Sequence, residues 1–250
     1  MDVRGRSVLV TGAASGIGFA CAAMLTDGGV SDITLVDCDR EGLEDVLLTL
    51  RSRSDAEIRT RLVDLADPGQ LARLFDEADR EFPPDVVLNN AGIVTGTPLF
   101  PEAEEARILQ VIAVNTSAVI LGTRRAVLGM ARRGGGVVIN TSSSAAVRTQ
   151  QVADIVYAAS KAAVSTFTRH CRGFAEAYGV RVNAVLPGIV DTPILLKSNN
   201  GQMSPWVQEV RARSKIMAPA EVAEAVLDLI RDDQAAGLNV LLTDGNREYV

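Results

Sequence analysis

The sequence has very little histidine and cysteine, and this scarcity narrows the chemistry open to the chain. Its 250 residues include one histidine, His170, and three cysteines. A Ser-His-Asp hydrolase needs a histidine beside its serine, and a zinc site needs several suitably spaced ligands, so we expect neither, and no metal. Because the cysteines are odd in number and widely spaced, they fit free thiols in a cytoplasm better than disulfides.

Long apolar runs and clusters of basic residues are also lacking. No apolar run approaches the roughly 18 residues that a membrane span needs, and the N-terminal stretch MDVRGRSVLV lacks the features of an export signal. The 25 basic and 31 acidic side chains give a net charge of −6, which argues against binding a phosphate polymer. We therefore expect no nucleic-acid partner, no membrane partner and a cytoplasmic location.

Strand-like and helix-like runs alternate along the whole chain. Parallel strands need crossover connections, and helices must then cover both faces of the sheet. The sequence therefore predicts an α/β fold, a single Rossmann-type domain over residues 1–250 with a doubly wound parallel sheet of about seven strands. The predicted strands are Ser7–Val10, Ile33–Val36, Arg59–Val63, Val86–Leu88, Val137–Asn140, Arg181–Leu186 and Val240–Leu242. The long irregular stretch at about 191–218 is predicted to be a substrate lid.

Three glycines in TGAASGIG, residues 11–18, follow the first predicted strand. At this turn an open parallel sheet places a nucleotide phosphate against a helix N-terminus. Gly12 would make the turn, Gly16 would let the backbone approach the pyrophosphate, and Gly18 would let the helix pack on the sheet. A tight turn without a ligand is the alternative interpretation of such a cluster.

Two carboxylates favour the nucleotide interpretation. Asp37 ends the second predicted strand, where it can accept hydrogen bonds from an adenosine ribose, and Asp64-Leu65 ends the third, where an Asp can reach the adenine edge. Asp37 would repel a 2′-phosphate and Ser15 supplies no cation, so NAD is favoured over NADP. Arg40 keeps NADP open, because it could pair with a phosphate if Asp37 turned away.

Tyr157 and Lys161 lie four residues apart in a predicted helix and therefore share one face. A nearby ammonium favours the phenolate, and a free tyrosine loses its proton only at about pH 10, so a fixed cation lets tyrosine act as a base closer to neutrality. Such a pair usually lies on a solvated surface. The upstream serines and the glycine loop favour the catalytic interpretation here.

The motifs together resemble the short-chain dehydrogenase/reductase family over nearly the whole chain. They are TGAASGIG, NNAG at Asn89–Gly92, Asn115, INTSS at Ile139–Ser143, YAASK at Tyr157–Lys161 and PGIVDT at Pro187–Thr192. Within the family, VYAASK, GVRVNAVLPGIVDTPIL and LIRDD look most like the NAD-linked 15-hydroxyprostaglandin dehydrogenase branch. Asn246 departs from the pattern, because many members have a second glycine there, which leaves the C-terminal packing open.

The resemblance implies a mechanism. Tyr157 takes the alcohol proton, a serine of INTSS holds the substrate oxygen, Lys161 also binds the nicotinamide ribose, and Asn115 holds a water in a proton relay. Thr192 and the backbone of Ile189 would fix the carboxamide. The implied catalytic residues are Asn115, Ser143, Tyr157 and Lys161, and the implied coenzyme contacts are Gly12, Ser15, Gly16, Ile17, Gly18, Asp37, Asp64, Leu65, Asn90, Ala91, Gly92, Tyr157, Lys161, Pro187, Gly188, Ile189 and Thr192.

Three serines in a row leave the catalytic one to be chosen. Counting back thirteen residues from Tyr157, the usual family spacing, reaches Ser144, whereas matching the strand INTSS reaches Ser143. The pleat fixes the direction of residues leaving a buried strand, whereas the following loop can absorb an insertion at little cost. We therefore predict Ser143, with Ser144 as the alternative.

The leading functional hypothesis is an NAD-dependent dehydrogenase acting on a secondary hydroxyl of a mostly apolar small molecule. An NADPH-linked reductase of acyl or polyketide ketones and a non-catalytic coenzyme sensor are the alternatives. The expected apolar lid residues are Ile194, Leu195, Leu196, Met203 and Trp206. Asp154 is expected to face the substrate cleft or to cap a loop, and the resemblance implies a homo-oligomer, a tetramer or a dimer, that pairs through the predicted helices Glu104–Met130 and Ile155–Tyr178.

Overall fold

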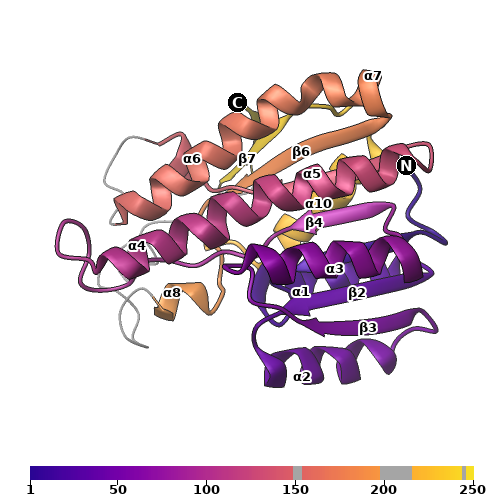
Figure 1. Cartoon of the computed structure of the whole chain (residues 1–250), viewed down its shortest axis with the longest axis horizontal. Coiled ribbons are helices and arrows are strands. Elements are labelled where there is room, and N and C mark those ends of the chain that lie inside the picture. The colour runs from indigo at the N-terminus through magenta and orange to yellow at the C-terminus, as the bar shows by residue number, and fades with distance from the viewer. Residues whose placement is uncertain (149–153, 198–215, 244–245) are drawn as a thin grey trace.

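One sheet runs through the part of the chain that the computed structural model describes, residues 1–148, 154–197, 216–243 and 246–250. Its strand order is β3-β2-β1-β4-β5-β6-β7-β8, and every neighbouring pair is parallel except β7 and β8 (Figure 1). The strands are β1 (Ser7–Thr11), β2 (Asp32–Asp37), β3 (Glu57–Leu62), β4 (Val86–Asn89), β5 (Gly136–Thr141), β6 (Val180–Pro187), β7 (Asn239–Thr243) and β8 (Asn246–Tyr249). The order reverses between β1 and β4, and open α/β sheets bind ligands beyond the carboxyl ends of the strands at such a point.

Helices cover both faces of this sheet. In Figure 1, α3, α5 and α6 lie across the front, whereas α1 and α10 pack together behind the sheet. The helices are α1 (Gly16–Asp27), α2 (Arg40–Arg51), α3 (Pro68–Glu81), α4 (Glu105–Ile112), α5 (Ala118–Ala131), α6 (Ile155–His170), α7 (Phe174–Tyr178), α8 (Ile194–Lys197) and α10 (Pro219–Arg231). This arrangement confirms the predicted doubly wound α/β fold.

The alternation of side chains along β1 explains why both faces need cover. All five residues of this strand are buried. Val8 and Val10 pack in one apolar cluster with residues of α1 and α10, whereas Leu9 packs in a second cluster with Leu74 of α3. Successive side chains of a strand point to opposite faces, so an apolar residue at every position requires helices on both sides.

The structure differs from the sequence-based expectations at three places. The antiparallel strand β8 was not predicted, because all its residues are exposed and carry no buried-strand pattern. The predicted helix Glu104–Met130 is divided by a π-helix at Ala113–Ser117, and Ile155–Tyr178 is divided by a 3-10 turn at Cys171–Gly173.

Only the ends of the predicted lid can be described, since residues 198–215, with Met203 and Trp206, lie outside the described residues. Its two ends are held together, because the Asp191 amide donates to the Met217 carbonyl (2.9 Å) and the Met217 amide donates to the Ile189 carbonyl (2.9 Å). The short helix α8 begins at Ile194.

The segment Glu105–Ala131, which contains α4, the π-helix and α5, is more apolar than the sequence analysis expected. It is long and apolar enough to cross a membrane by length and composition alone, with a mean hydropathy of 1.4 in its best window. In this fold α5 packs against β4, β5 and β6, and 33% of that apolar window is buried inside the structure. The length and composition of one such segment are weak evidence for a membrane span.

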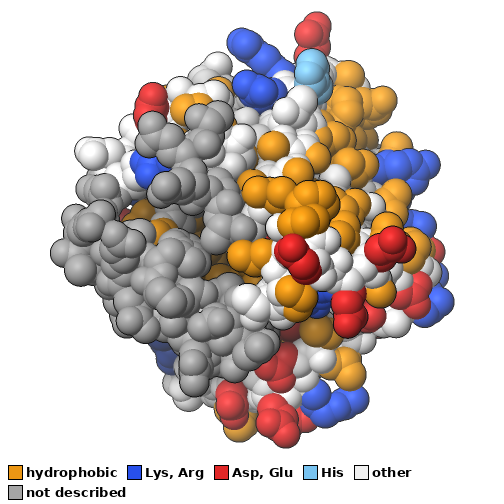
Figure 2. Space-filling model, turned by 90° about the vertical axis from the view of Figure 1, so that its left-hand side faces the viewer, with side chains coloured by type: hydrophobic (Ala, Val, Ile, Leu, Met, Phe, Trp, Pro, Cys, Tyr) orange, Lys and Arg blue, Asp and Glu red, His pale blue; other side chains and the backbone are white. Residues whose placement is uncertain are grey.

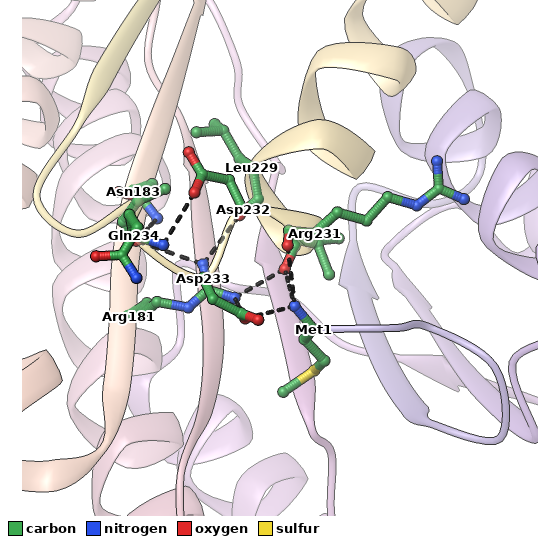
Figure 3. Close-up of polar contacts among 10 residues, drawn as sticks. Met1, Arg181, Asn183, Leu229, Arg231, Asp232, Asp233 and Gln234 are labelled. Atoms are coloured by element: carbon green, nitrogen blue, oxygen red, sulfur yellow. Dashed lines mark hydrogen bonds and ion pairs between the residues drawn. The ribbon is translucent and has the colours of Figure 1, made fainter.

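Two cations hold the C-terminal end of α10 (Figure 3). Arg181 of β6 is buried, and its guanidinium donates to the carbonyls of Leu229 (3.0 Å) and Ile230 (2.7 Å). The ammonium of Met1 donates to the Ile230 carbonyl (3.0 Å) and to Oδ1 of Asp233 (2.6 Å). Positive groups at this end satisfy carbonyls that have no partner within the helix.

Candidate active site

The glycine loop forms the floor of a cleft at the carboxyl ends of β1 and β4. Gly12 and Gly16 have φ angles of 67° and 56°, which disfavour any residue with a side chain. A Cβ at Gly18 would lie 1.9 Å from the Gly12 carbonyl oxygen, so the first turn of α1 packs directly on the loop. The loop brings α1 against the cleft, as predicted.

The N-terminus of α1 is suited to an anion. Its N-cap residue, Ser15, makes no side-chain capping bond, whereas α2, α3 and α6 are capped by Asp39, Asp67 and Asp154. The amides of an uncapped first turn can bind an anion, and the helix dipole favours its negative charge. This end of the cleft fits the pyrophosphate of a dinucleotide.

Asp37 is held rigidly at the end of β2. Its carboxylate accepts hydrogen bonds from the backbone amides of Ala14 (3.0 Å), Cys38 (2.8 Å) and Asp39 (3.1 Å). Arg40 is exposed and is not among the residues that line the cleft. A 2′-phosphate placed beside Asp37 would therefore meet a fixed negative charge.

Most of the predicted coenzyme contacts lie together along this cleft. Those that line it are Gly12, Ser15, Gly16, Ile17, Asp37, Asp64, Leu65, Asn90, Ala91, Gly92 and Thr192. Gly18 lies behind the loop. Pro187, Gly188 and Ile189 lie at the end of β6 but are not lining residues; the Gly188 amide donates to the Leu242 carbonyl (2.8 Å), and the Ile189 carbonyl accepts from Met217.

Asn90 joins three strand ends. Its Nδ2 donates to the Thr11 carbonyl (3.0 Å) at the end of β1, and its Oδ1 accepts from the Thr141 hydroxyl (3.2 Å) at the end of β5. The hydroxyl of Thr11 in turn accepts from the Asn90 amide (3.0 Å). The side chain of Asn90 thus fixes the strand ends.

The residue pair of α6 lies beside the segment that follows β5. This pair is Tyr157 and Lys161, and the segment carries Ser143. The Ser143 side chain acts on the phenol of Tyr157 and lowers its pKa, and the Ser143 hydroxyl accepts from the Ala145 amide (3.2 Å). Nζ of Lys161 lies 5.8 Å from the centroid of the Tyr157 ring. Ser142 points elsewhere, because its hydroxyl donates to the Lys161 carbonyl (2.7 Å), and Ser144 begins a 3-10 helix, Ser144–Ala146. The structure therefore places Ser143 at the phenol.

Burial dominates the electrostatics of this group. Lys161 is 2% exposed, and burial lowers the pKa of its ammonium to about 8 while Nζ donates to the Thr141 carbonyl (2.7 Å). Burial also raises the pKa of the Tyr157 phenol. The interaction with Ser143 opposes that rise in the pKa, whereas the negative charge of Asp154 adds to it.

Asn115 lies buried in the π-helix, and its side chain is engaged with protein groups. Its Nδ2 donates to the Ile93 carbonyl (2.8 Å) and to the Ser160 hydroxyl (3.0 Å), and its Oδ1 accepts from the Ile93 amide (2.8 Å). Both side-chain amide hydrogens are used within the protein. The water that the sequence analysis expects Asn115 to hold stays a prediction. In the structure, the Asn115 side chain holds the backbone of Ile93 through its amide and its carbonyl.

The sequence analysis missed Arg107, and it named Asp154 without its place at the start of α6. Arg107 of α4 lines the cleft and donates to the carbonyls of Val94 (2.5 Å) and Thr95 (3.2 Å). Asp154 caps α6 rather than only a loop. An Asp before an apolar helix is a readable capping signal, whereas the contacts of Arg107 depend on the path of the loop after β4, which no local pattern indicates.

Comparison with known proteins identifies the family. The model of the short chain dehydrogenase family matches residues 6–203. The chain belongs to the short-chain dehydrogenase/reductase family. It is therefore an oxidoreductase of the alcohol dehydrogenase and ketone reductase type.

Curated relatives of this short-chain dehydrogenase/reductase act on different molecules. It is 34% identical to cis-4-hydroxycyclohexanecarboxylate dehydrogenase of Sinomonas cyclohexanicum, over 91% of this chain and 90% of that protein. It is 33% identical to 15-hydroxyprostaglandin dehydrogenase [NAD(+)] of Mus musculus, over 97% and 91%. The predicted resemblance to 15-hydroxyprostaglandin dehydrogenase is thus confirmed at the level of the family. It does not establish the substrate of this chain.

Solved structures of the family agree with the fold. Levodione reductase matches with a TM-score of 0.86 and 28% identity over 97% of both chains. L-sorbose reductase of Gluconobacter frateurii, complexed with NADPH and L-sorbose, matches with a TM-score of 0.85 and 26% identity over 98% of both chains. Among these proteins, the name of one specifies NAD(+) and the structure of another holds NADPH.

Proposed function

We propose that this short-chain dehydrogenase/reductase is NAD-dependent and transfers hydride between a secondary alcohol or its ketone, in a mostly apolar small molecule, and the nicotinamide. The observation that carries this proposal is the Tyr157 phenol beside buried Lys161, whose Nζ lies 5.8 Å from the ring centroid, with Ser143 acting on the same phenol. Gly92 connects this group to the cleft, because a Cβ there would lie 3.2 Å from Nζ of Lys161.

The proposed NAD preference rests on Asp37. Turning it away to admit a phosphate would break three hydrogen bonds to a charged group, each of which contributes about 1.5–3 kcal/mol. The name of the mouse relative specifies NAD(+), which supports the same choice. The NADPH-complexed sorbose reductase favours the alternative, an NADPH-linked ketone reductase.

The side chains have distinct proposed tasks. Bound NAD⁺ would supply the hydride acceptor. The deprotonated phenol of Tyr157 accepts the hydroxyl proton of the alcohol, and the Ser143 hydroxyl donates to the substrate oxygen. Lys161 favours the phenolate by its positive charge and holds the nicotinamide ribose. A sensor without catalysis would not need this set, so we consider that alternative weaker.

Apolar side chains near the phenol support a mostly apolar substrate. Val147 and Ile155 belong to the two segments that carry Ser143 and Tyr157, and they are 43% and 50% exposed. Ile93 and Ile194 line the neighbouring cleft. Figure 2 shows further hydrophobic side chains exposed in the right-hand half of this view of the molecule.

A turnover screen tests this function. A panel of secondary alcohols is offered with NAD⁺ and with NADP⁺, and the matching ketones with NADH and with NADPH, against Tyr157→Phe as a control that keeps the ring. We expect alcohol oxidation with NAD⁺, reduced by roughly 100-fold or more in the variant, since a general base contributes about 10²–10⁴. Ketone reduction only with NADPH would support the alternative, and an active Tyr157→Phe would overturn the mechanism.

We also propose a cytoplasmic homo-oligomer, a tetramer or a dimer, that pairs through the outer faces of α4, α5 and α6. Leu109, Leu121 and Leu128 are 69%, 36% and 41% exposed on the first two helices. Ala159 and Ala163 form an exposed, small-residue surface on α6, which permits close approach. Burying exposed leucines is the ordinary driving force for association.

A further inference from the structure

We infer that Asp154 is a positioning residue for Tyr157: its carboxylate ties the first turn of α6 to the segment Ile93–Thr95, so that the phenol is held in its reactive place. The inference rests on the proposed function. It assigns to Asp154 a task other than the substrate contact expected from the sequence.

The two carboxylate oxygens of Asp154 face different elements. Oδ1 accepts from the backbone amide of Tyr157 (2.9 Å), which is the N-cap bond of α6. Oδ2 accepts from the amide of Thr95 (2.7 Å) and from its hydroxyl (2.6 Å). With three hydrogen bonds to the protein, this carboxylate already has partners that a substrate hydroxyl would have to displace.

The segment Ile93–Thr95 is irregular and is held from its other side by α4 and the π-helix. Asn115 binds both the amide and the carbonyl of Ile93, and Arg107 binds the carbonyls of Val94 and Thr95. Irregular backbone needs such partners, because its polar groups have no ladder or helix bonds. The segment is thus a fixed support, and Asp154 transmits its position to Tyr157.

This support matters because catalysis is sensitive to small displacements. A misplacement of about 1 Å can lower a rate by roughly 100-fold. Without the Asp154 carboxylate, the first turn of α6 loses its N-cap bond. It also loses the two hydrogen bonds that join it to the amide and the hydroxyl of Thr95. The Tyr157 amide belongs to that first turn, so the phenol would move with it.

Substitutions can separate the two halves of the contact. Asp154→Ser keeps a capping hydroxyl but is too short to reach Thr95 as well, and Thr95→Val removes one bond at constant volume. Asp67→Ser is the matched control, because Asp67 caps α3 in the same manner, with its carboxylate on the amides of Gly69 and Gln70. We expect Asp154→Ser to lower kcat by roughly 10- to 100-fold with unchanged NADH affinity, and Asp67→Ser to leave kcat unchanged.

The titration of the phenol is a second readout, and it needs no substrate. The chain has three tyrosines, so ring-labelled tyrosine followed by NMR, with Tyr157→Phe for assignment, gives the Tyr157 signal. Among the described residues, the charged groups at the phenol are Asp154 and Lys161; of the elements packed against α6, the 3-10 helix Ser144–Ala146 and the π-helix carry no charged side chain, and α4 carries Glu105 and Arg107. Removing the negative charge of Asp154 should lower the pKa of Tyr157 and shift the rising limb of kcat to lower pH.

The outcomes distinguish this inference from the proposed function. An active Tyr157→Phe overturns the function, whatever Asp154 does. If Tyr157→Phe is inactive but Asp154→Ser keeps the wild-type kcat and phenol pKa, the positioning role is wrong. An Asp154→Ser that raises only KM for the alcohol would show a substrate contact instead. Thr95→Val should also lower kcat, and combined with Asp154→Ser it should lower kcat no further, because both remove the same tie.

Discussion

Lys161 is a cation kept inside the protein, and its burial has a cost that the proposed chemistry explains. Its folded pKa of about 8 lies below the ordinary value of 10.5. The folded state therefore holds fewer protons than the unfolded state between these two values, so stability rises with pH across that window. Below pH 8 the full cost is present, about 3 kcal/mol at roughly 1.4 kcal/mol per pKa unit.

Lys161→Met should therefore be inactive and yet more stable than the wild type. The apolar side chain removes the buried charge but leaves the Thr141 carbonyl without its hydrogen bond, so we expect a net gain on the order of 2 kcal/mol at pH 7. The gain should shrink toward about pH 10. Urea unfolding of both proteins at the two pH values measures it, and equal unfolding free energies at neutral pH would contradict a buried ammonium.

The choice between two serines can also be tested at single residues. Ser143→Ala removes the hydroxyl that meets the Tyr157 phenol, and we expect the barrier to rise by about 2.7–4 kcal/mol, a loss of roughly 100-fold or more in kcat. Ser144→Ala should keep most of the activity, and NADH affinity should change little in either. Steady-state kinetics decide the question, with a dead Ser144→Ala and an active Ser143→Ala as the contrary result.

At the scale of elements, Arg181 holds the end of α10 to the sheet (Figure 3). Replacing it by Met leaves the buried carbonyl of Leu229 without this donor and leaves the Ile230 carbonyl with only the Met1 ammonium, so we expect the free energy of unfolding to fall by about 1–3 kcal/mol. Turnover per folded molecule should not change, because α10 lies away from the phenol. Chemical denaturation measures the loss. Asp233→Asn is the control, since that side chain is 73% exposed and should matter little.

The sequence predicted the elements of the sheet well because buried parallel strands are short apolar runs. Val8 and Val10 need no tertiary information to be recognised as such. The strand β8 could not be recognised in this way, since Arg247 and Glu248 are exposed and pair only with an edge already formed. The break between α4 and α5 also escaped, because the apolar pattern continues through it while Asn115 bonds to Ile93, far away in the chain.

The sequence predicted only those residues of the candidate site that belong to short motifs. The spacing of Tyr157 and Lys161 and the strand before Ser143 indicated which side chains come together, although their roles stay predictions. The support around them was not indicated, because Arg107 and Thr95 meet through a loop whose course the sequence does not reveal. A polar network that depends on tertiary contacts has no local signature.

At the scale of the whole molecule, the exposed leucines of α4 and α5 predict association. Leu121→Glu combined with Leu128→Glu places charges on that face without entering the core, so we expect the assembly to dissociate into smaller species of intact fold. Light scattering measures the mass, and circular dichroism checks the fold. A wild-type protein that scatters as a monomer of 26.5 kDa would show that this face is not an interface.

We propose that the cleft beyond β1 and β4 binds NAD in preference to NADP, and a fluorescence titration with NADH and NADPH tests this preference without knowledge of the substrate. We expect the wild type to bind NADH at least about tenfold more tightly than NADPH, a difference of about 1.4 kcal/mol in binding free energy. Asp37→Ser should lose most of that preference by weakening NADH and admitting the 2′-phosphate. Equal or tighter binding of NADPH by the wild type would contradict the assignment of Asp37 and, with it, the NAD-dependent function.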